Sequence, residues 1–333
     1  MKKVALLGYG TVGKGVVSII KKKREFDLVY IFARKNRFDP QYPGLFTDDI
    51  DAVIDNPEID IVVETLGGFD FAYSCIKSSL EHRKSVVTAN KEVVATKLDE
   101  LTLLAKENGV SFMYEASVGG GIPIIKPLLE IVKTSEVSSI YGILNGTTNF
   151  ILTKMNEGMD FEDALRKAQE LGFAEKDPSA DLEGLDMVRK IAVLADLAWN
   201  TFVPIDRISH ISISKIGRKE IEYAKSSGLV IKFVCSAKKE GGKITLGVAP
   251  YYLGKDHPFA GVQNESNAIM LKTFPNGDLT FIGKGAGSLP TASAIVGDLY
   301  CIDKNMAFDG YSARNVYDFL PKAIGEEIER LGE

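Results

Sequence analysis

A chain of 333 residues exceeds the size at which a single hydrophobic core stops growing, so we expect two domains. Hydrophobic residues make up 45% and charged residues 26%, as in ordinary water-soluble proteins. The formal net charge of -5 argues against a nucleic-acid or anionic-membrane partner. Three separated cysteines and three histidines form no zinc-type cluster, and no apolar run reaches the ~20 residues of a membrane span. We therefore expect a soluble cytoplasmic protein with reduced cysteines.

The first half alternates short apolar runs with helical patterns, which is typical of parallel strands joined by crossover helices. Strands are predicted at residues 4–7, 28–32, 61–63, 85–88 and 111–114. Helices are predicted from the early glycines to residue 20, at 71–80 and at 98–107. The pattern predicts an α/β Rossmann-type domain, a doubly wound parallel sheet over residues 1–128 that a C-terminal helix at 305–333 completes.

The second half differs in character after about residue 125. Strands are predicted at residues 137–144, 230–237, 244–251, 268–274 and 279–282. Helices are predicted at 161–171 and 182–199, with closing helices at 290–299 and 317–331. We therefore expect an α+β domain over residues 129–304, with a mixed or antiparallel sheet.

The sequence GYGTVG follows the first predicted strand and opens a helix, which is the context a dinucleotide-binding turn requires. Gly8 would permit the tight turn, Gly10 would let the backbone approach a pyrophosphate, and Gly13 would allow close packing of helix on strand. Thr11 and Val12 would lie at the helix N-terminus, which faces the anion. The alternative is a glycine-rich turn without a ligand.

The end of the second predicted strand indicates which dinucleotide is bound. An acidic residue there would read the ribose 2′-hydroxyl of NAD, but this chain has Arg34 and Lys35. Two cationic side chains suit a 2′-phosphate, so NADP is favoured over NAD, although exposed basic residues in a loop are also common.

Carboxylates and lysines in two places could carry chemistry. Asp186 and Lys190 are spaced i, i+4, so they share one helix face and form either a surface ion pair or a proton donor for an alkoxide. Glu175 lies just upstream of this pair. Thr65 and Lys91 follow two predicted parallel strands at the carboxyl edge, where ligands bind in such sheets.

Over nearly its whole length the chain resembles the homoserine dehydrogenase family. The resemblance rests on the segments GYGTVG, ETLGG, TANKEV, EASVGGGIPII, GILNGTTNFIL, EKDPSADLEGLDMVRK and GKGAGSLPTASAIVGDL. It implies NAD(P)-dependent interconversion of aspartate 4-semialdehyde and homoserine. It also implies a short form without a fused aspartate kinase or ACT-type domain, and a homodimer formed through the sheet of the catalytic second domain.

The resemblance implies roles for individual residues. Lys190 matches the proton-transfer lysine, Asp186 a substrate-binding aspartate, and Glu175 the glutamate that holds the amino-acid part of the substrate. Lys91 matches a second active-site lysine near cofactor and substrate, and the turn at Gly146 and Thr147 would help to position the substrate. Thr65, Gly285 and the glycines of residues 8–13 match cofactor contacts.

The resemblance further implies a site for a monovalent cation, sodium or potassium. Its ligands would be the carboxylate of Glu115 and the backbone carbonyls of Val118, Gly120 and Ile122. Such a set of hard oxygen donors suits an alkali cation. The alternative is that Glu115 caps the helix predicted to begin near Ile122.

The residues argue against two other functions. A phosphorylating semialdehyde dehydrogenase needs a nucleophilic thiolate, but Cys75, Cys235 and Cys301 each lack an adjacent histidine. A regulatory protein that binds NAD(P) without turnover would not need the acidic residues and lysine at 175–190.

Overall fold

The computed structural model describes residues 1–306, 314–322 and 328–331. The chain forms two compact units. Unit 1 comprises Met1–Pro123 and Ala286–Ala313, and unit 2 comprises Ile124–Gly285 and Arg314–Glu333. No helix among the described residues is long and apolar enough to cross a membrane.

Unit 1 is built on a six-stranded parallel sheet in the order β3-β2-β1-β4-β5-β6. Its strands are β1 (Lys2–Leu7), β2 (Phe26–Phe32), β3 (Phe46–Thr47), β4 (Ile61–Glu64), β5 (Ser85–Thr88) and β6 (Phe112–Met113). The central strands β1, β4 and β5 are buried on both faces because helices cover the sheet on each side. The order reverses at β1 and β4, so the carboxyl ends of these strands form the edge where ligands bind.

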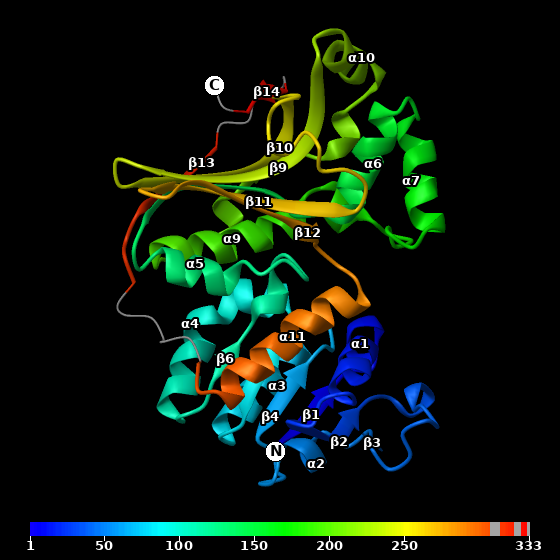
Figure 1. The fold of residues 1–333 in the computed structure, drawn as a ribbon, viewed down its shortest axis with the longest axis vertical. Coiled ribbons are helices and arrows are strands. Elements are labelled where there is room, and N and C mark those ends of the chain that lie inside the picture. The colour runs from blue at the N-terminus through cyan, green and yellow to red at the C-terminus, as the bar shows by residue number, and fades with distance from the viewer. Residues whose placement is uncertain (307–313, 323–327, 332–333) are drawn as a thin grey trace. The chain divides into compact units, whose positions relative to one another are not determined.

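The helices of unit 1 come from both ends of its sequence. They are α1 (Thr11–Ile20), α2 (Asp51–Ile54), α3 (Asp70–Glu81), α4 (Lys91–Glu107) and α11 (Ser288–Asp303), with 3-10 turns at Lys35–Arg37 and Glu115–Ser117. Helices α1 and α11 pack together against one face of the sheet (Figure 1). Gly15 makes this approach possible, because a Cβ there would lie 2.6 Å from the carbonyl oxygen of Ser288.

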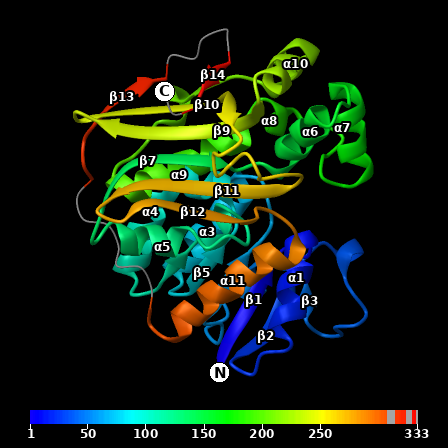
Figure 2. The ribbon, with the colours of Figure 1, turned by 45° about the horizontal axis from the view of Figure 1, so that its top comes forward.

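Unit 2 contains a mixed sheet whose main strands are antiparallel, in the order β12-β11-β7-β9-β10-β13. Its strands are β7 (Glu136–Ile143), β8 (Ser209–His210), β9 (Leu229–Glu240), β10 (Lys243–Gly254), β11 (Ser266–Phe274), β12 (Gly277–Lys284), β13 (Asp318–Pro321) and β14 (Glu329–Arg330). The short strands β8, β13 and β14 pair in parallel with β10. Figure 2 shows the long strands lying side by side.

The helices of unit 2 are α5 (Ile125–Ile131), α6 (Gly146–Asn156), α7 (Phe161–Glu170), α8 (Ser179–Leu182), α9 (Leu185–Trp199) and α10 (Arg218–Ser226), with 3-10 turns at Ile205–Arg207 and Ile213–Lys215. The apolar helix α9 packs on one face of the sheet, against β7, β9 and β10. On the other face, Phe259 and Val262 from the loop after β10 cover a second apolar cluster. The sheet is thus buried over much of both faces.

The predicted fold class is confirmed: a Rossmann-like parallel sheet is followed by a domain with a mixed sheet. The helix predicted at 317–331 is wrong for the described residues, because Asp318–Pro321 and Glu329–Arg330 form strands along β10. The rest of the helix predicted at 305–333 falls partly outside the described residues. The C-terminal helix that completes unit 1 is α11. It lies within residues 129–304, the range predicted for the second domain.

Two other helix predictions need correction, and one helix is missing from the prediction. The predicted helix at 182–199 is interrupted at Gly184, whose φ of +81° ends α8 and starts α9 in a new direction. Helix α4 begins at Lys91 rather than at residue 98, because Asn90 caps it by accepting hydrogen bonds from the N–H groups of Glu92 and Val93. Helix α6 was not predicted at all.

Candidate active site

The predicted glycine turn joins β1 to α1 in unit 1. At each of its three glycines the absence of a side chain has a different consequence. Gly8 has a φ of +100°, and a Cβ there would lie 2.6 Å from the carbonyl oxygen of Thr65. A Cβ on Gly13 would lie 2.2 Å from the carbonyl oxygen of Gly8, so this glycine allows helix and strand to touch. A Cβ on Gly10 would meet nothing within 4 Å. The turn therefore leaves open space at Gly10, at the N-terminus of α1, where an anionic pyrophosphate would fit.

Thr11, Val12 and Gly13 form the first turn of α1 directly after Gly10. The hydroxyl of Thr65, the first residue after β4, donates to the carbonyls of Leu7 and Gly8 at 3.1 Å each. The structure thus brings Thr65 and the glycine turn together at the carboxyl edge of the sheet. This is the location that the motif predicts for the dinucleotide.

A buried glutamate ties the loops after β4 and β5 together. Glu64 accepts a hydrogen bond from the N–H of Leu66 at 2.7 Å and another from the hydroxyl of Thr88. Burial raises the pKa of the Glu64 carboxyl, against the effect of these hydrogen bonds. The side chain of Asn90 donates to the carbonyl of Gly68 at 2.7 Å, and Lys91 follows it as the first residue of α4. Lys91 therefore lies at the same sheet edge as Thr65.

The basic residues predicted to select the cofactor lie in the exposed loop after β2. Arg34 precedes the 3-10 turn at Lys35–Arg37, and the Lys35 ammonium lies 3.3 Å from the carboxylate of Asp48. The hydroxyl of Tyr9, in the glycine turn, donates to Asp39 in this loop at 2.8 Å. Burial and the Asp39 carboxylate raise the pKa of Tyr9. The loop that carries Arg34 is thereby joined to the glycine turn.

The acid–lysine pair on α9 is buried in unit 2. Lys190 is 8% exposed, and its ammonium donates to the carboxylate of Asp186 at 2.8 Å and to the carbonyl of Leu144 at 2.7 Å. Leu144 follows β7, so the sheet and α9 together hold the ammonium. The interpretation of this pair as a solvated surface ion pair is excluded by its burial. A desolvated ammonium with a fixed direction is suited to proton transfer.

Asn145, which no sequence argument singled out, joins two carboxylates at this site. Its side-chain amide donates to Asp181 at 2.7 Å and to Asp186 at 3.0 Å. Its side-chain oxygen accepts from the N–H of Thr148 at 2.9 Å and so caps α6. The capping position could have been recognised from Asn-Gly-Thr-Thr before an apolar run, but the contacts to residues 181 and 186 could not.

The remaining predicted substrate residues surround the start of α6, with one exception. The hydroxyl of Thr147 donates to the carbonyl of Phe173 at 2.6 Å. Gly146 packs so closely on the loop after β10 that a Cβ would lie 2.8 Å from the carbonyl oxygen of Glu265. Glu175 is exposed in the loop between α7 and α8, two residues beyond the carbonyl that Thr147 binds. Among the described contacts, its side chain is not joined to the Asp186–Lys190 pair.

The predicted cation ligands lie in unit 1, in the turn between β6 and Pro123, where the first of the two chain segments of this unit ends. Glu115 is buried, and its backbone N–H donates to the carboxylate of Asp298 at 2.9 Å. Gly119 and Gly120 both have positive φ, at +76° and +57°, between Val118 and Ile122. Helix α5 begins at Ile125, three residues after the predicted start near Ile122, and the side chain of its N-cap residue Ile124 makes no capping hydrogen bond.

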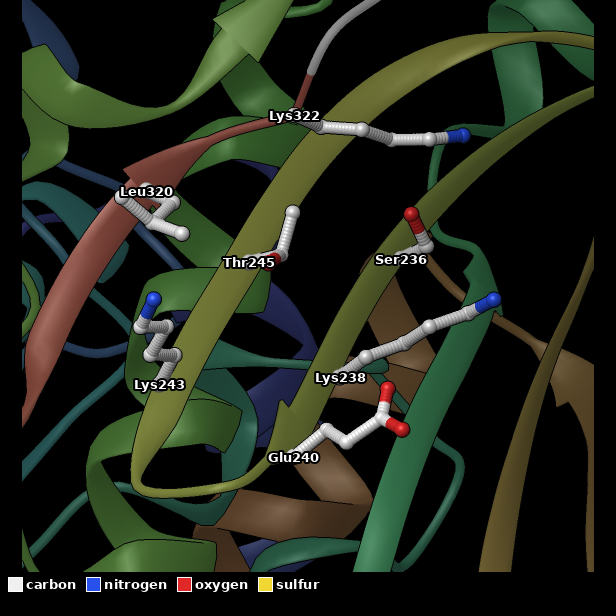
Figure 3. A pocket seen from close by; sticks show the side chains of 7 residues that line it. All are labelled: Ser236, Lys238, Glu240, Lys243, Thr245, Leu320 and Lys322. Carbon is white, nitrogen blue, oxygen red and sulfur yellow. The ribbon is translucent and has the colours of Figure 1, made fainter.

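Two further features do not contribute to the predicted site. Burial raises the pKa of Cys75 to about 11 and that of Cys235 to about 12, which disfavours the thiolate that a covalent mechanism needs. A pocket of about 470 Å³ lies on the sheet of unit 2 between β9, β10 and β13 (Figure 3). None of the predicted site residues lines it. Gly285, which was predicted to contact the cofactor, lies against the side chain of Asn267 so closely that a Cβ would not fit.

Family models match both parts of the chain. Residues 123–300 match the family model described as homoserine dehydrogenase, and residues 8–115 match the one described as homoserine dehydrogenase, NAD binding domain. A homoserine dehydrogenase of Bacillus subtilis is 41% identical over 318 residues, which cover 91% of this chain and 73% of that protein.

Solved structures give the same result for the fold. A homoserine dehydrogenase from Thiobacillus denitrificans matches with a TM-score of 0.89 and 34% identity, covering 96% of this chain and 79% of that one. A hyperthermophilic archaeal homoserine dehydrogenase in complex with NADPH matches with a TM-score of 0.79 and 27% identity, covering 92% and 98%.

Proposed function

This chain belongs to the homoserine dehydrogenase family, and from that premise we propose how its residues divide the work of the reaction. The protein is an NAD(P)-dependent oxidoreductase. It reversibly reduces L-aspartate 4-semialdehyde to L-homoserine, a step in the synthesis of threonine, methionine and isoleucine. Unit 1 binds the dinucleotide, and unit 2 supplies the groups that hold and protonate the substrate.

The dinucleotide lies on the glycine turn of unit 1. The open space at Gly10 and the N-terminus of α1 accept its pyrophosphate, and Thr65 and Lys91 border the same sheet edge. Arg34 and Lys35 bind a 2′-phosphate, so NADPH is used in preference to NADH. The exposure of both basic side chains supports this assignment, and the structural relative in complex with NADPH is consistent with it.

The buried Lys190 ammonium is the observation that carries the proposed mechanism. When bound, the reduced nicotinamide supplies the hydride that adds to the aldehyde carbon. Lys190 donates a proton to the aldehyde oxygen, which becomes the hydroxyl of homoserine. Asp186 and the Leu144 carbonyl hold two of the three N–H bonds of the ammonium, which leaves the third for the substrate oxygen. Glu175 binds the substrate ammonium, and Gly146 and Thr147 position the rest.

A monovalent cation, sodium or potassium, supports the turn after β6. The buried Glu115 carboxylate and the carbonyls of Val118, Gly120 and Ile122 would be its ligands. Two successive glycines with positive φ let the backbone turn sharply enough to present several carbonyls to one point. Replacing sodium and potassium by a bulky organic cation should lower the melting temperature if this assignment is right.

We further propose a cytoplasmic homodimer that forms through the sheet of unit 2. Phe274 of β11, Ile282 of β12 and Leu320 of β13 are 76%, 58% and 43% exposed, so strands of this sheet present apolar side chains that a partner could cover. The three cysteines are free thiols, as is usual in the reducing cytoplasm. Analytical ultracentrifugation of the whole chain tests the dimer directly.

A lysine substitution tests the proton donor. Lys190→Ala should lower kcat for aspartate semialdehyde by about 100- to 10,000-fold, because it removes the general acid. NADPH affinity should stay the same, since Lys190 belongs to unit 2. Lys154→Ala on α6 is the matched control, because Lys154 is also a partly buried lysine with a carboxylate partner, but that partner is Glu157, which is not a predicted site residue. Turnover is followed by NADPH absorbance, and near wild-type turnover in Lys190→Ala would show that another group donates the proton.

A further inference from the structure

The turn between β7 and α6 holds the Lys190 ammonium from two sides. The carbonyl of Leu144 accepts one of its hydrogen bonds directly. The next residue, Asn145, reaches the ammonium through Asp186, because Asp186 accepts from both side chains with the same oxygen, Oδ2. Two adjacent residues therefore restrict both acceptors of the ammonium.

The amide of Asn145 also keeps two carboxylates close together. Its nitrogen donates to Asp181 at 2.7 Å and to Asp186 at 3.0 Å, so one planar group bridges α8 and α9. Like charges this close repel each other unless donors lie between them. Asn145 is 5% exposed, so water cannot readily replace it. The left-handed Gly184 separates the short helix α8 from α9, so contacts such as these help to fix the direction of one helix relative to the other.

We infer that Asn145 is a positioning residue for proton transfer: by bridging Asp181 and Asp186 it fixes the direction in which Lys190 presents its proton to the substrate. This inference rests on the proposed role of Lys190. It assigns to the Asn-Gly turn a part in catalysis that differs from its local role as the cap of α6.

Asn145→Asp and Asn145→Ser separate bridging from capping. Asp and Ser are both good N-caps, so each can still accept from the N–H of Thr148. Neither has an amide that can donate to two carboxylates. Asn156→Asp is the matched control, because Asn156 lies in the last turn of the same helix and its side-chain amide donates to the carbonyl of Ile231 rather than to a carboxylate.

Both Asn145 variants should keep NADPH affinity and a melting temperature close to that of Asn156→Asp. Their kcat should fall by about 10- to 100-fold, the effect expected for a lost hydrogen bond to a charged group. The deficit of Asn145→Asp should shrink at lower pH, because a protonated carboxyl regains one donor. The charged groups joined to residue 145 are Asp181 and Asp186, which accept from it directly, and Lys190, which is joined to it through Asp186. The nearby thiol of Cys235 stays neutral in this range, since burial raises its pKa to about 12.

The outcomes distinguish this inference from the proposed function. An active wild type with an inactive Lys190→Ala establishes the role of Lys190 independently of Asn145. Wild-type kcat in Asn145→Ser, or a deficit in Asn145→Asp that is the same at every pH, would overturn the bridging role. A crystal structure of Asn145→Ser gives a readout without turnover: Asp181 and Asp186 should move apart, and unchanged positions would also overturn it.

Discussion

Two glycines of the same turn should respond in opposite ways to the addition of one methyl group. In Gly13→Ala the new Cβ would lie 2.2 Å from the carbonyl oxygen of Gly8, whereas ordinary contacts begin at 3.4 Å. Helix α1 must therefore withdraw by roughly 1 Å from β1, and overpacking of this kind costs about 1–3 kcal/mol. At about 2–4 °C per kcal/mol for a domain of this size, the melting temperature of unit 1 should fall by roughly 2–12 °C.

Gly10→Ala should leave stability nearly unchanged, because its Cβ would meet nothing within 4 Å. Alanine is a poorer N-cap than glycine, but it also reduces the entropy of the unfolded chain, so the net change should be within about 0.5 kcal/mol. The methyl group would occupy the space of the pyrophosphate, and NADPH should bind about 5- to 150-fold more weakly, the equivalent of about 1–3 kcal/mol.

The assays are differential scanning fluorimetry without cofactor and a fluorescence titration with NADPH, each on the whole chain. The reasoning predicts a crossed pattern, with stability lost in Gly13→Ala and affinity lost in Gly10→Ala. If Gly10→Ala bound NADPH as tightly as wild type, the pyrophosphate would not lie at this turn. If Gly13→Ala melted at the wild-type temperature, the close approach of α1 to β1 would be refuted.

Two further predictions concern the stability of unit 2. Gly184→Ala should lose about 1–3 kcal/mol, because its φ is +81° and its Cβ would lie 3.0 Å from Phe233 and Val248. Gly228→Ala, with a φ of +70° and open space around it, should lose less in urea unfolding; equal losses would show that packing at Gly184 contributes nothing. Lys232 is buried, and desolvation lowers its pKa from 10.5 to about 8. Between pH 8 and pH 10.5 the unfolded chain keeps the Lys232 proton that the folded chain has lost, so the free energy of unfolding of wild type rises with pH. Lys232→Met lacks this group. Relative to the variant, wild type should therefore become more stable by up to roughly 3 kcal/mol over this pH range. Melting temperatures of the two proteins at pH 7 and pH 10 measure this gain, and a constant difference between them would contradict it.

The glycine turn could be predicted from the sequence because its reasons are local. Gly8, Gly10 and Gly13 act within one strand–turn–helix unit, so their spacing is enough to assign them. The pairing of Asp186 with Lys190 is equally local, since i, i+4 residues share a helix face. Both predictions depend on distances of a few residues along the chain.

Other features could not be predicted because their partners are distant in sequence. Asn145 contacts Asp181 and Asp186 across 36 and 41 residues, and no local pattern indicates that contact. Helix α6 is buried on nearly every side, so it lacks the amphipathic period that identifies a helix. Strands β13 and β14 form because β10 offers them a pairing edge, and this tertiary context overrides the local helical pattern.

Unit 1 is discontinuous in the sequence, and this affects the order in which the protein can fold during synthesis. Helix α1 needs α11 as its packing partner, and the hydroxyl of Ser288 donates to the carbonyl of Thr11 beside the glycine turn at 2.6 Å. A ribosome adds about 5–20 residues per second, so α1 waits for many seconds before residue 288 exists. The strands from β7 to β12 are complete at Lys284, before α11 is made. The cofactor turn, although nearly first in the sequence, therefore reaches its final packing among the last parts of the protein.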